Sequence, residues 1–245
     1  MVTTVATEGT TLAGGRFVLG TALGTGGMGV VHRAFDTKRG IYVALKSLGT
    51  IVDAAAVASF KVEFREFQHL SHPGLVALDE LFGEGDTWYF TMEYVAGEDL
   101  LAHVRRFAGH VAPPVTELEV TSEGPPSELR LGAGRVEYPG RFDEGRLLGP
   151  LEALSEALHY LHRAEKVHCD VTSANVLVRP DGRTVLLDFG VSVDVRAPAR
   201  LRAATPVYLA PEMLRGVATP AADWYSVGVL LFLAAGCEYA AKPVL

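Results

Sequence analysis

Three glycines stand between two runs of residues typical of β-strands, and this arrangement limits how the start of the chain can fold. Gly24, Gly26 and Gly29, followed by Val31, have the spacing GxGxxGxV. Glycines let backbone amides approach a triphosphate closely, although glycine-rich hairpins without any ligand are also common. Residues 30–35 read as a strand, whereas a dinucleotide-binding glycine turn requires a helix at that point. The pattern therefore predicts a glycine-rich β-hairpin.

Hydrophobic periodicity divides the chain into a small sheet and a mainly helical half. Residues 17–48 are apolar and β-branched runs broken by glycines, which predict short antiparallel strands. Residues 57–70 carry apolar side chains at helical spacing, and two more strand-like runs follow before residue 95. A strong helical pattern resumes at 147–164, and an apolar helix follows Ala221. We therefore expect an α+β chain.

Shifts in composition predict the domain boundaries. Residues 1–15 are rich in Thr, Ala and Gly, and we expect them to be a disordered leader. Residues 16–95 form the predicted first unit, and residues 96–245 form the second. Within the second unit, residues of about 107–145 are rich in Pro, Gly and Glu and have no sustained period, which predicts a loop insertion.

Charge and cysteine content exclude several classes of function. The formal net charge of −7 and the absence of a basic stripe argue against nucleic-acid binding. Cys169 and Cys237 have neither metal-ligand spacing nor a framework of pairs, so we expect a reducing, cytoplasmic environment. The longest apolar run, 227–235, is about half of what a membrane-spanning helix needs, so we expect no membrane segment.

A lysine closes an apolar strand seventeen residues after the last of the three glycines. Such a lysine commonly just extends its amine to solvent. Alternatively, Lys46 places a fixed positive charge on the α- and β-phosphates of a nucleotide, oriented by a carboxylate. Glu63 on the predicted helix is the first candidate for that carboxylate, and Glu66 is the second.

Two short motifs in the second half contain the residue types that phosphoryl transfer needs. His168, Asp170 and Asn175 have the spacing HxDxxxxN, and Asp188 begins a DFG motif eighteen residues beyond Asp170. One carboxylate can orient and deprotonate an attacking hydroxyl, while an amide and a second carboxylate can hold Mg²⁺ against the phosphates. Each aspartate alone could be a helix cap or a turn residue. The order and spacing of all these residues favour a single site.

Taken together, these motifs resemble the protein kinase family, in particular the eukaryotic-type Ser/Thr kinases of bacteria, whose glycine loop often reads LGxGGMGxV. The resemblance covers about residues 17–236 and includes an APE signature at 210–212 and Asp223 at the start of an apolar helix. It implies a bilobal protein-kinase-like fold, with an antiparallel sheet and one helix in the N-lobe and a mainly helical C-lobe. It also implies ATP and Mg²⁺ as cofactors and Ser/Thr hydroxyls of a protein substrate as acceptors.

The resemblance also implies roles for individual residues. Asp170 would be the catalytic base, and Asn175 and Asp188 would bind the metal. Lys46 would pair with Glu63 and contact the phosphates. The implied nucleotide site comprises Leu23, Gly24, Gly26, Gly29, Val31, Ala44, Lys46, Met92, Glu93, Val95, Asp99 and Leu177.

Within the implied nucleotide site, the resemblance gives most residues a position around the base. Met92 would lie at the back of the pocket, and the backbone from Glu93 to Val95 would form the hinge that binds adenine. Asp99 would reach the ribose. The apolar side chains that would enclose the adenine ring are those of Val31, Ala44 and Leu177.

Three features depart from the family pattern. Thr172 stands where Ser/Thr kinases carry a lysine that contacts the γ-phosphate, so we expect a slower enzyme. Cys169 stands where an arginine usually binds a phosphorylated activation loop. The chain ends at Leu245, before the last helices of the family, so we expect a C-terminally truncated C-lobe that a missing segment or a partner would complete.

Two other functions remain open at this point. An ATP-binding pseudokinase scaffold would keep the nucleotide site and lose transfer, and Thr172 and the early chain end favour it. A small-molecule phosphotransferase of related fold carries a similar HxDxxxxN loop, but such enzymes generally lack DFG followed by APE. A binding module without a nucleotide accounts for fewer of the motifs.

Overall fold

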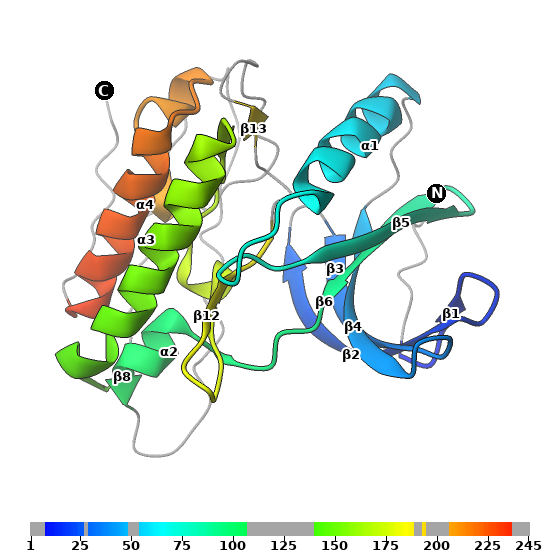
Figure 1. Ribbon diagram of the computed structural model, residues 1–245, viewed down its shortest axis with the longest axis horizontal. Helices are drawn as coiled ribbons and strands as arrows, with labels where there is room; N and C mark the ends of the chain where they lie inside the picture. The colour runs from blue at the N-terminus through cyan, green and yellow to red at the C-terminus, as the bar shows by residue number, and fades with distance from the viewer. Residues whose placement is uncertain are drawn as a thin grey trace, which may run out of the picture. The chain divides into compact units, whose positions relative to one another are not determined.

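The computed structural model describes residues 8–26, 29–48, 54–106, 140–188, 193–194 and 206–236 (Figure 1). It divides into two compact units, Met1–Ala96 and Gly97–Leu245. No helix in these ranges has the length and apolar character needed to cross a membrane.

The first unit is built on an antiparallel sheet with the strand order β1-β2-β3-β4-β6-β5. The strands of its described part are β1 Thr11–Leu12, β2 Phe17–Gly26, β3 Gly29–Asp36, β4 Ile41–Leu48, β5 Leu78–Glu84 and β6 Thr87–Glu93. Because consecutive strands are joined by short turns, β2, β3 and β4 pair in sequence order. The predicted antiparallel hairpins are confirmed.

Burial alternates along β3 and shows which face of the sheet packs against the core. His32, Ala34 and Asp36 are buried, whereas Arg33 is half-buried and Phe35 is exposed. Successive side chains of a strand point to opposite faces, so this pattern places one face of β3 against a core. That core contains Leu12, Phe17, Leu19, Ala34, Val43, Leu45 and Tyr89, with Phe82 packed against it.

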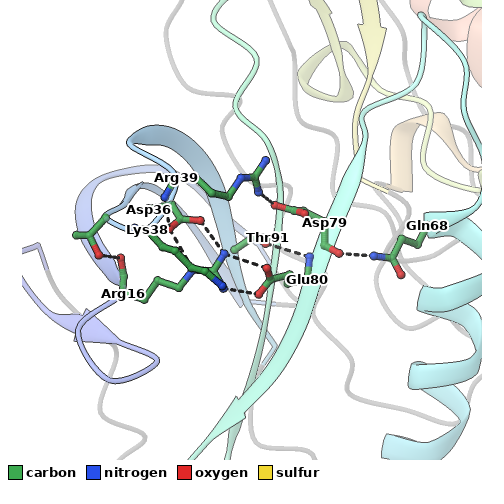
Figure 2. Close-up of polar contacts among 9 residues, drawn as sticks. Arg16, Asp36, Lys38, Arg39, Gln68, Asp79, Glu80 and Thr91 are labelled. Carbon is green, nitrogen blue, oxygen red and sulfur yellow. Dashed lines mark hydrogen bonds and ion pairs between the residues drawn. The ribbon is translucent and has the colours of Figure 1, made fainter.

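Helix α1 (Ala54–Gln68) is the one helix of the described part of the first unit. Phe64 and Phe67 are buried, and the Phe64 ring lies 5.7 Å from that of Phe90 on β6. At its last residue, Gln68 donates its side-chain amide to the backbone carbonyl of Asp79 on β5 (Figure 2). Aromatic packing and this hydrogen bond together fix the helix on the sheet.

An ionic network ties β2, β3 and β5 together at one end of the sheet, as Figure 2 shows. Arg16 donates to both carboxylate oxygens of Asp36, at 3.1 and 2.8 Å, and to both of Glu80, at 2.7 and 2.9 Å. The Asp36 side chain is fully buried, whereas the Glu80 side chain is 45% exposed. Arg39 in the β3–β4 turn makes a second, more exposed ion pair with Asp79.

The start of the sheet corrects the expected leader. Leu12 is buried, and β1 pairs with β2 through Leu12 and Phe17. Further backbone hydrogen bonds join Gly9 and Thr10 to Leu19. The expectation of disorder over residues 1–15 is therefore wrong for residues 8–15, because one apolar side chain and a few edge hydrogen bonds are enough to add a short strand. Residues 1–7 lie outside the described ranges.

The second unit is mainly helical, as predicted. Its helices are α2 Leu100–Val104, α3 Leu148–Arg163 and α4 Pro220–Ala234, with short 3₁₀ turns at Glu144–Arg146, Ser173–Asn175, Pro206–Tyr208 and Met213–Arg215. Its short strands are β7 Glu98–Asp99, β8 Arg105–Arg106, β9 Arg141–Phe142, β10 Lys166–Val167, β11 Val176–Val178, β12 Thr184–Leu186 and β13 Val193–Asp194. Helix α3 buries one face, formed by Leu154, Ala157, Leu158 and Leu161.

The last residues of the predicted insertion, whose expected bounds are 107–145, have regular structure. Residues 107–139 lie outside the described part of the chain, but β9 pairs with β8 and a 3₁₀ turn begins at Glu144. Asp143 caps that turn by accepting from the N–H of Gly145 at 3.1 Å. The expectation of a loop is therefore wrong for residues 141–145, because the strand pair and the cap supply backbone partners that composition alone does not reveal.

Candidate active site

The glycine hairpin joins β2 to β3 with Gly24 opposite Val31 and Gly26 opposite Gly29. Gly29 has a φ of +133°, and a Cβ atom there would lie 1.8 Å from the carbonyl oxygen of Ser47 on β4. Only glycine fits such a position without moving the neighbouring backbone. By contrast, a Cβ atom on Gly24 would meet nothing within 4 Å. The two glycines therefore have different physical roles.

We expect Gly29→Ala to lower the free energy of unfolding by about 1–3 kcal/mol, because the new methyl group collides with β4 and the backbone is strained. Gly24→Ala is the matched control, since the added methyl group meets open space. Urea unfolding of the two variants and the wild type measures the difference. Equal stability of the two variants would contradict the close approach of Gly29 to Ser47.

Four predicted nucleotide-site residues share one face of the sheet. Val31 lies opposite Lys46, and Ala44 lies opposite Met92. Directly opposed residues share a face, and so do residues two apart on one strand, which places all four side chains together. Lys46, Ala44 and Met92 are buried. An amine thus lies on the same apolar surface that is predicted to enclose adenine.

The carboxylate candidates lie on α1. Glu63 and Glu66 are both exposed, while Phe64 and Phe67 take the packed side of the helix. The pairing of Lys46 with Glu63 stays a prediction, and Glu66 remains the second candidate.

The predicted hinge begins at the end of β6. Glu93 lies opposite Val43, and its N–H donates to the carbonyl of Ala77 at 2.9 Å. Val95 is buried, and Leu23 on β2 is exposed. Their contacts with adenine stay predictions.

In the second unit, two of the predicted catalytic residues are in direct contact. Asn175 donates its side-chain amide to Asp170 Oδ2 at 2.9 Å and to the Asp170 carbonyl at 2.8 Å. The N–H of Leu187 donates to the carbonyl of Asn175 at 2.7 Å, so Asp188 follows the residue that is bonded to Asn175. Asp170, Asn175 and Asp188 are all half-buried. This places the HxDxxxxN loop beside the first residue of the DFG motif.

A buried carboxylate on α4 holds the backbone of this loop. Asp223 accepts from the N–H of His168 at 2.9 Å and from that of Cys169 at 2.8 Å. Its Oδ2 also lies 2.7 Å from His162 Nε2 on α3. Cys169 has a φ of +65°, which is uncommon for a residue with a side chain. Asp223 therefore stabilises the turn that presents Asp170.

The His168 side chain also links the HxDxxxxN loop to the residue before the DFG motif. Its Nε2 donates to the carbonyl of Leu187 at 2.8 Å, and its Nδ1 accepts from the N–H of Asp170 at 3.2 Å. Asp188, the next residue after Leu187, has a φ of +56°. Such strained backbone persists only where surrounding contacts enforce it, and it is concentrated at functional sites.

Two further predicted nucleotide residues pair in the second unit. Asp99 on β7 lies opposite Leu177 on β11. Asp99 also caps α2 by accepting from the N–H of Ala102 at 3.0 Å, and burial raises the pKa of its carboxyl. The cap uses one acceptor position of the carboxylate, which leaves further lone pairs for the predicted ribose contact. That contact stays a prediction.

The family model for protein tyrosine and serine/threonine kinases matches residues 17–242 of this chain. The chain belongs to this protein kinase family. Its two units therefore correspond to the N-lobe and the C-lobe of a kinase domain, and the fold predicted from the motifs is confirmed.

Several relatives of the chain at 32% identity are bacterial kinases. The chain is 32% identical over 234 residues to the serine/threonine-protein kinase PknA of Mycobacterium tuberculosis, covering 91% of this chain and 47% of that protein. It is 32% identical over 228 residues to the probable serine/threonine-protein kinase SCO3848 of Streptomyces coelicolor, covering 89% and 30%. The chain thus spans half or less of the length of these curated relatives.

A solved structure shows the same fold. A cysteine-to-alanine mutant of the PknI kinase domain of M. tuberculosis matches with a TM-score of 0.67 and 23% identity, covering 98% of this chain and 81% of that one. The resemblance to bacterial eukaryotic-type Ser/Thr kinases is confirmed.

The polar residues of the C-lobe fit a hard divalent cation. Magnesium prefers oxygen ligands and usually keeps only one or two from protein, the others coming from water and phosphates. The Asn175 side-chain oxygen and the Asp188 carboxylate supply that donor type. No group of three or more His, Cys, Asp or Glu side chains that could hold a metal occurs within the described ranges. The donor types of Asn175 and Asp188 fit a site in which water and phosphates supply the remaining ligands.

Sequence reasoning missed how much depends on Asp223, which it identified only as the start of an apolar helix. A carboxylate at the beginning of helix α4, which is otherwise apolar, was the available signal, since a buried acid needs several donors. His162 was not singled out at all. Phe189 and Gly190 of the DFG motif lie outside the described residues.

Proposed function

We propose that the chain is a Ser/Thr protein kinase that transfers the γ-phosphate of ATP to hydroxyl groups of protein substrates. The observation that carries the proposal is the Asp170–Asn175 contact of 2.9 Å, held beside Asp188 by the Leu187–Asn175 backbone hydrogen bond. A base and two metal-ligand candidates thus lie on one loop system. The bacterial Ser/Thr kinases among its relatives support the choice of acceptor.

The proposed chemistry assigns each described residue one task. The Asp170 carboxylate orients the substrate hydroxyl and takes its proton as the oxygen attacks the γ-phosphorus and the bond to the β-phosphate oxygen breaks. Asn175 keeps Asp170 oriented and, with Asp188, would hold Mg²⁺, which supplies charge neutralisation on the phosphates. Lys46 contributes a fixed positive charge from the N-lobe sheet. The glycine hairpin supplies backbone amides to the phosphates.

Thr172 is the departure most relevant to rate. It is buried, and it stands where the family carries a lysine that contacts the γ-phosphate. Losing one preorganised donor in a transition state typically costs about 10²–10³ in kcat. We therefore propose slow transfer. We also propose a reducing, cytoplasmic environment, which is supported by a sequence with only two cysteines in no disulfide framework.

The test incubates the protein with Mg·ATP labelled at the γ-phosphate, with and without a generic basic protein. We expect label on serine or threonine of the protein substrate, and loss of that label in Asp188→Asn, because the amide weakens the metal site. Nucleotide binding without any transfer would contradict the proposal and favour a pseudokinase scaffold. Transfer only to small hydroxylated metabolites would contradict it in favour of a small-molecule phosphotransferase.

A further inference from the structure

An arginine on β3 lies against two tyrosine rings of the N-lobe. The guanidinium carbon of Arg33 lies 4.0 Å from the ring centroid of Tyr42 on β4 and 5.8 Å from that of Tyr94. Both distances are within the range of cation–π attraction. The interaction with Tyr42 is the largest cause that raises the pKa of Arg33. One charged side chain thus joins β3, β4 and the segment that follows β6.

The cluster of Arg33, Tyr42 and Tyr94 lies beside the sheet surface that is proposed to enclose adenine. Arg33 lies opposite Ala44, and Ala44 lies opposite Met92, so the three side chains form one row across β3, β4 and β6. Tyr42 shares this face, because it is two residues from Ala44 on the same strand. The cluster therefore borders the surface that is proposed to enclose adenine.

Tyr94 lies just beyond the end of the sheet ladder. The last pair between β4 and β6 is Val43 with Glu93, and the ladder does not include Tyr94. Cross-strand side-chain contacts stabilise neighbouring strands, and they can also act on a residue just beyond the last pair of the ladder. The Arg33 guanidinium provides such a contact. Tyr94 is also the middle residue of the proposed hinge, between Glu93 and Val95.

We propose that Arg33 is a positioning residue for nucleotide binding, which holds Tyr94 against the sheet and thereby orients the Glu93–Val95 backbone toward adenine. The inference rests on the proposed function, since it needs a nucleotide at this face. Arginine suits the task because its planar guanidinium stacks on aromatic rings and stays charged at every working pH. Arg33 acts through Tyr94 and touches no reacting atom.

The test compares Arg33→Met with the wild type. Methionine keeps an unbranched apolar chain and removes the charge. We expect the Kd of Mg·ATP to rise about three- to tenfold, the range that corresponds to losing an exposed to partly desolvated cation–π contact. KM for ATP should rise by the same factor, while kcat at saturating ATP stays within about twofold. The reason is that the lost contact stabilises bound ATP equally in the ground state and in the transition state. Binding of Mg·tripolyphosphate, which lacks the base, should not change.

Two further variants separate positioning from general destabilisation. Arg33→Lys keeps a cation and should recover part of the ATP affinity. Arg33→Met in a Tyr94→Leu background should cause no additional loss, because the contact is already gone. Arg39→Met is the matched control, since Arg39 pairs with Asp79 in an exposed turn and should leave the Kd of ATP unchanged.

The outcomes distinguish this inference from the proposed function. If the wild type binds no Mg·ATP, the proposed function fails first. If the wild type binds ATP and Arg33→Met binds it equally well, or loses ATP and tripolyphosphate affinity alike, the positioning role is overturned. A fall in melting temperature without a change in Kd would also overturn it, because Arg33 would then only stabilise the sheet.

Discussion

Asp170→Asn should lower kcat by about 10²- to 10⁴-fold, the usual range for removing a general base. Asparagine has nearly the same shape, and its side-chain oxygen can still accept the hydrogen bond from Asn175 that Asp170 Oδ2 accepts at 2.9 Å. The loop should therefore keep its geometry and lose only the negative charge that takes the proton. Initial rates with labelled ATP measure the effect.

Two measurements accompany this variant. The Kd of Mg·ATP should stay within a few-fold of the wild type, since Asp170 is assigned to the acceptor hydroxyl rather than to the nucleotide. Asp181→Asn is the matched control in the same lobe, because Asp181 is exposed in the β11–β12 turn and should leave kcat unchanged. Wild-type kcat in Asp170→Asn would remove Asp170 from the role of base.

Arg16→Met is expected to have the largest effect on stability, a loss of about 2–4 kcal/mol in the free energy of unfolding at pH 7. Arg16 forms two hydrogen bonds to Asp36, whose side chain is fully buried. Breaking a buried ion pair typically costs about 3–5 kcal/mol, because it leaves a charge without compensation. We expect a smaller cost here for two reasons. The Arg16 side chain is 19% exposed. Asp36 also keeps its hydrogen bonds from the N–H groups of Lys38 and Arg39 in the variant.

The loss should depend on pH in a defined direction. The hydrogen bond from Arg16 is the largest cause that holds the pKa of Asp36 below its ordinary value of 3.8. The pair is therefore fully stabilising above pH 3.8 and is lost as pH falls through the lower folded value. Without Arg16, Asp36 binds its proton at a higher pH than in the wild type, so the difference in stability between variant and wild type should narrow as pH falls below 3.8. Burial lowers the pKa of His32 in both proteins, so its titration should largely cancel.

Arg39→Met tests whether the effect comes from burial. Arg39 and Asp79 form an ion pair in the same network, but their side chains are 42% and 35% exposed. Exposed pairs contribute about 0–1 kcal/mol, so this variant should lose much less stability. Urea unfolding at pH 7 and at about pH 3 compares the two variants. If the two variants lost the same free energy of unfolding, the burial of Asp36 would not explain the cost of removing Arg16.

Prediction from sequence succeeded where the signal is local. The strand after the glycines predicted a hairpin, and β2 and β3 form it. The helical spacing at 147–164 predicted α3, which runs from Leu148 to Arg163. The expected disordered leader was wrong for residues 8–15, because β1 depends on pairing with β2, and composition does not record pairing. A two-residue strand is also too short for any periodic signal.

Residue types and their spacing in the sequence determined the family and predicted the chemistry, from the glycine hairpin through Lys46 to Asp170, Asn175 and Asp188. Only the tertiary structure decided which groups hold that chemistry in place. Asp223 supports the backbone of Cys169 across 54 positions of sequence, and Arg33 meets Tyr94 beyond the end of a ladder. Side-chain identity is fixed along the chain, but burial and hydrogen-bond partners arise only when distant segments pack together.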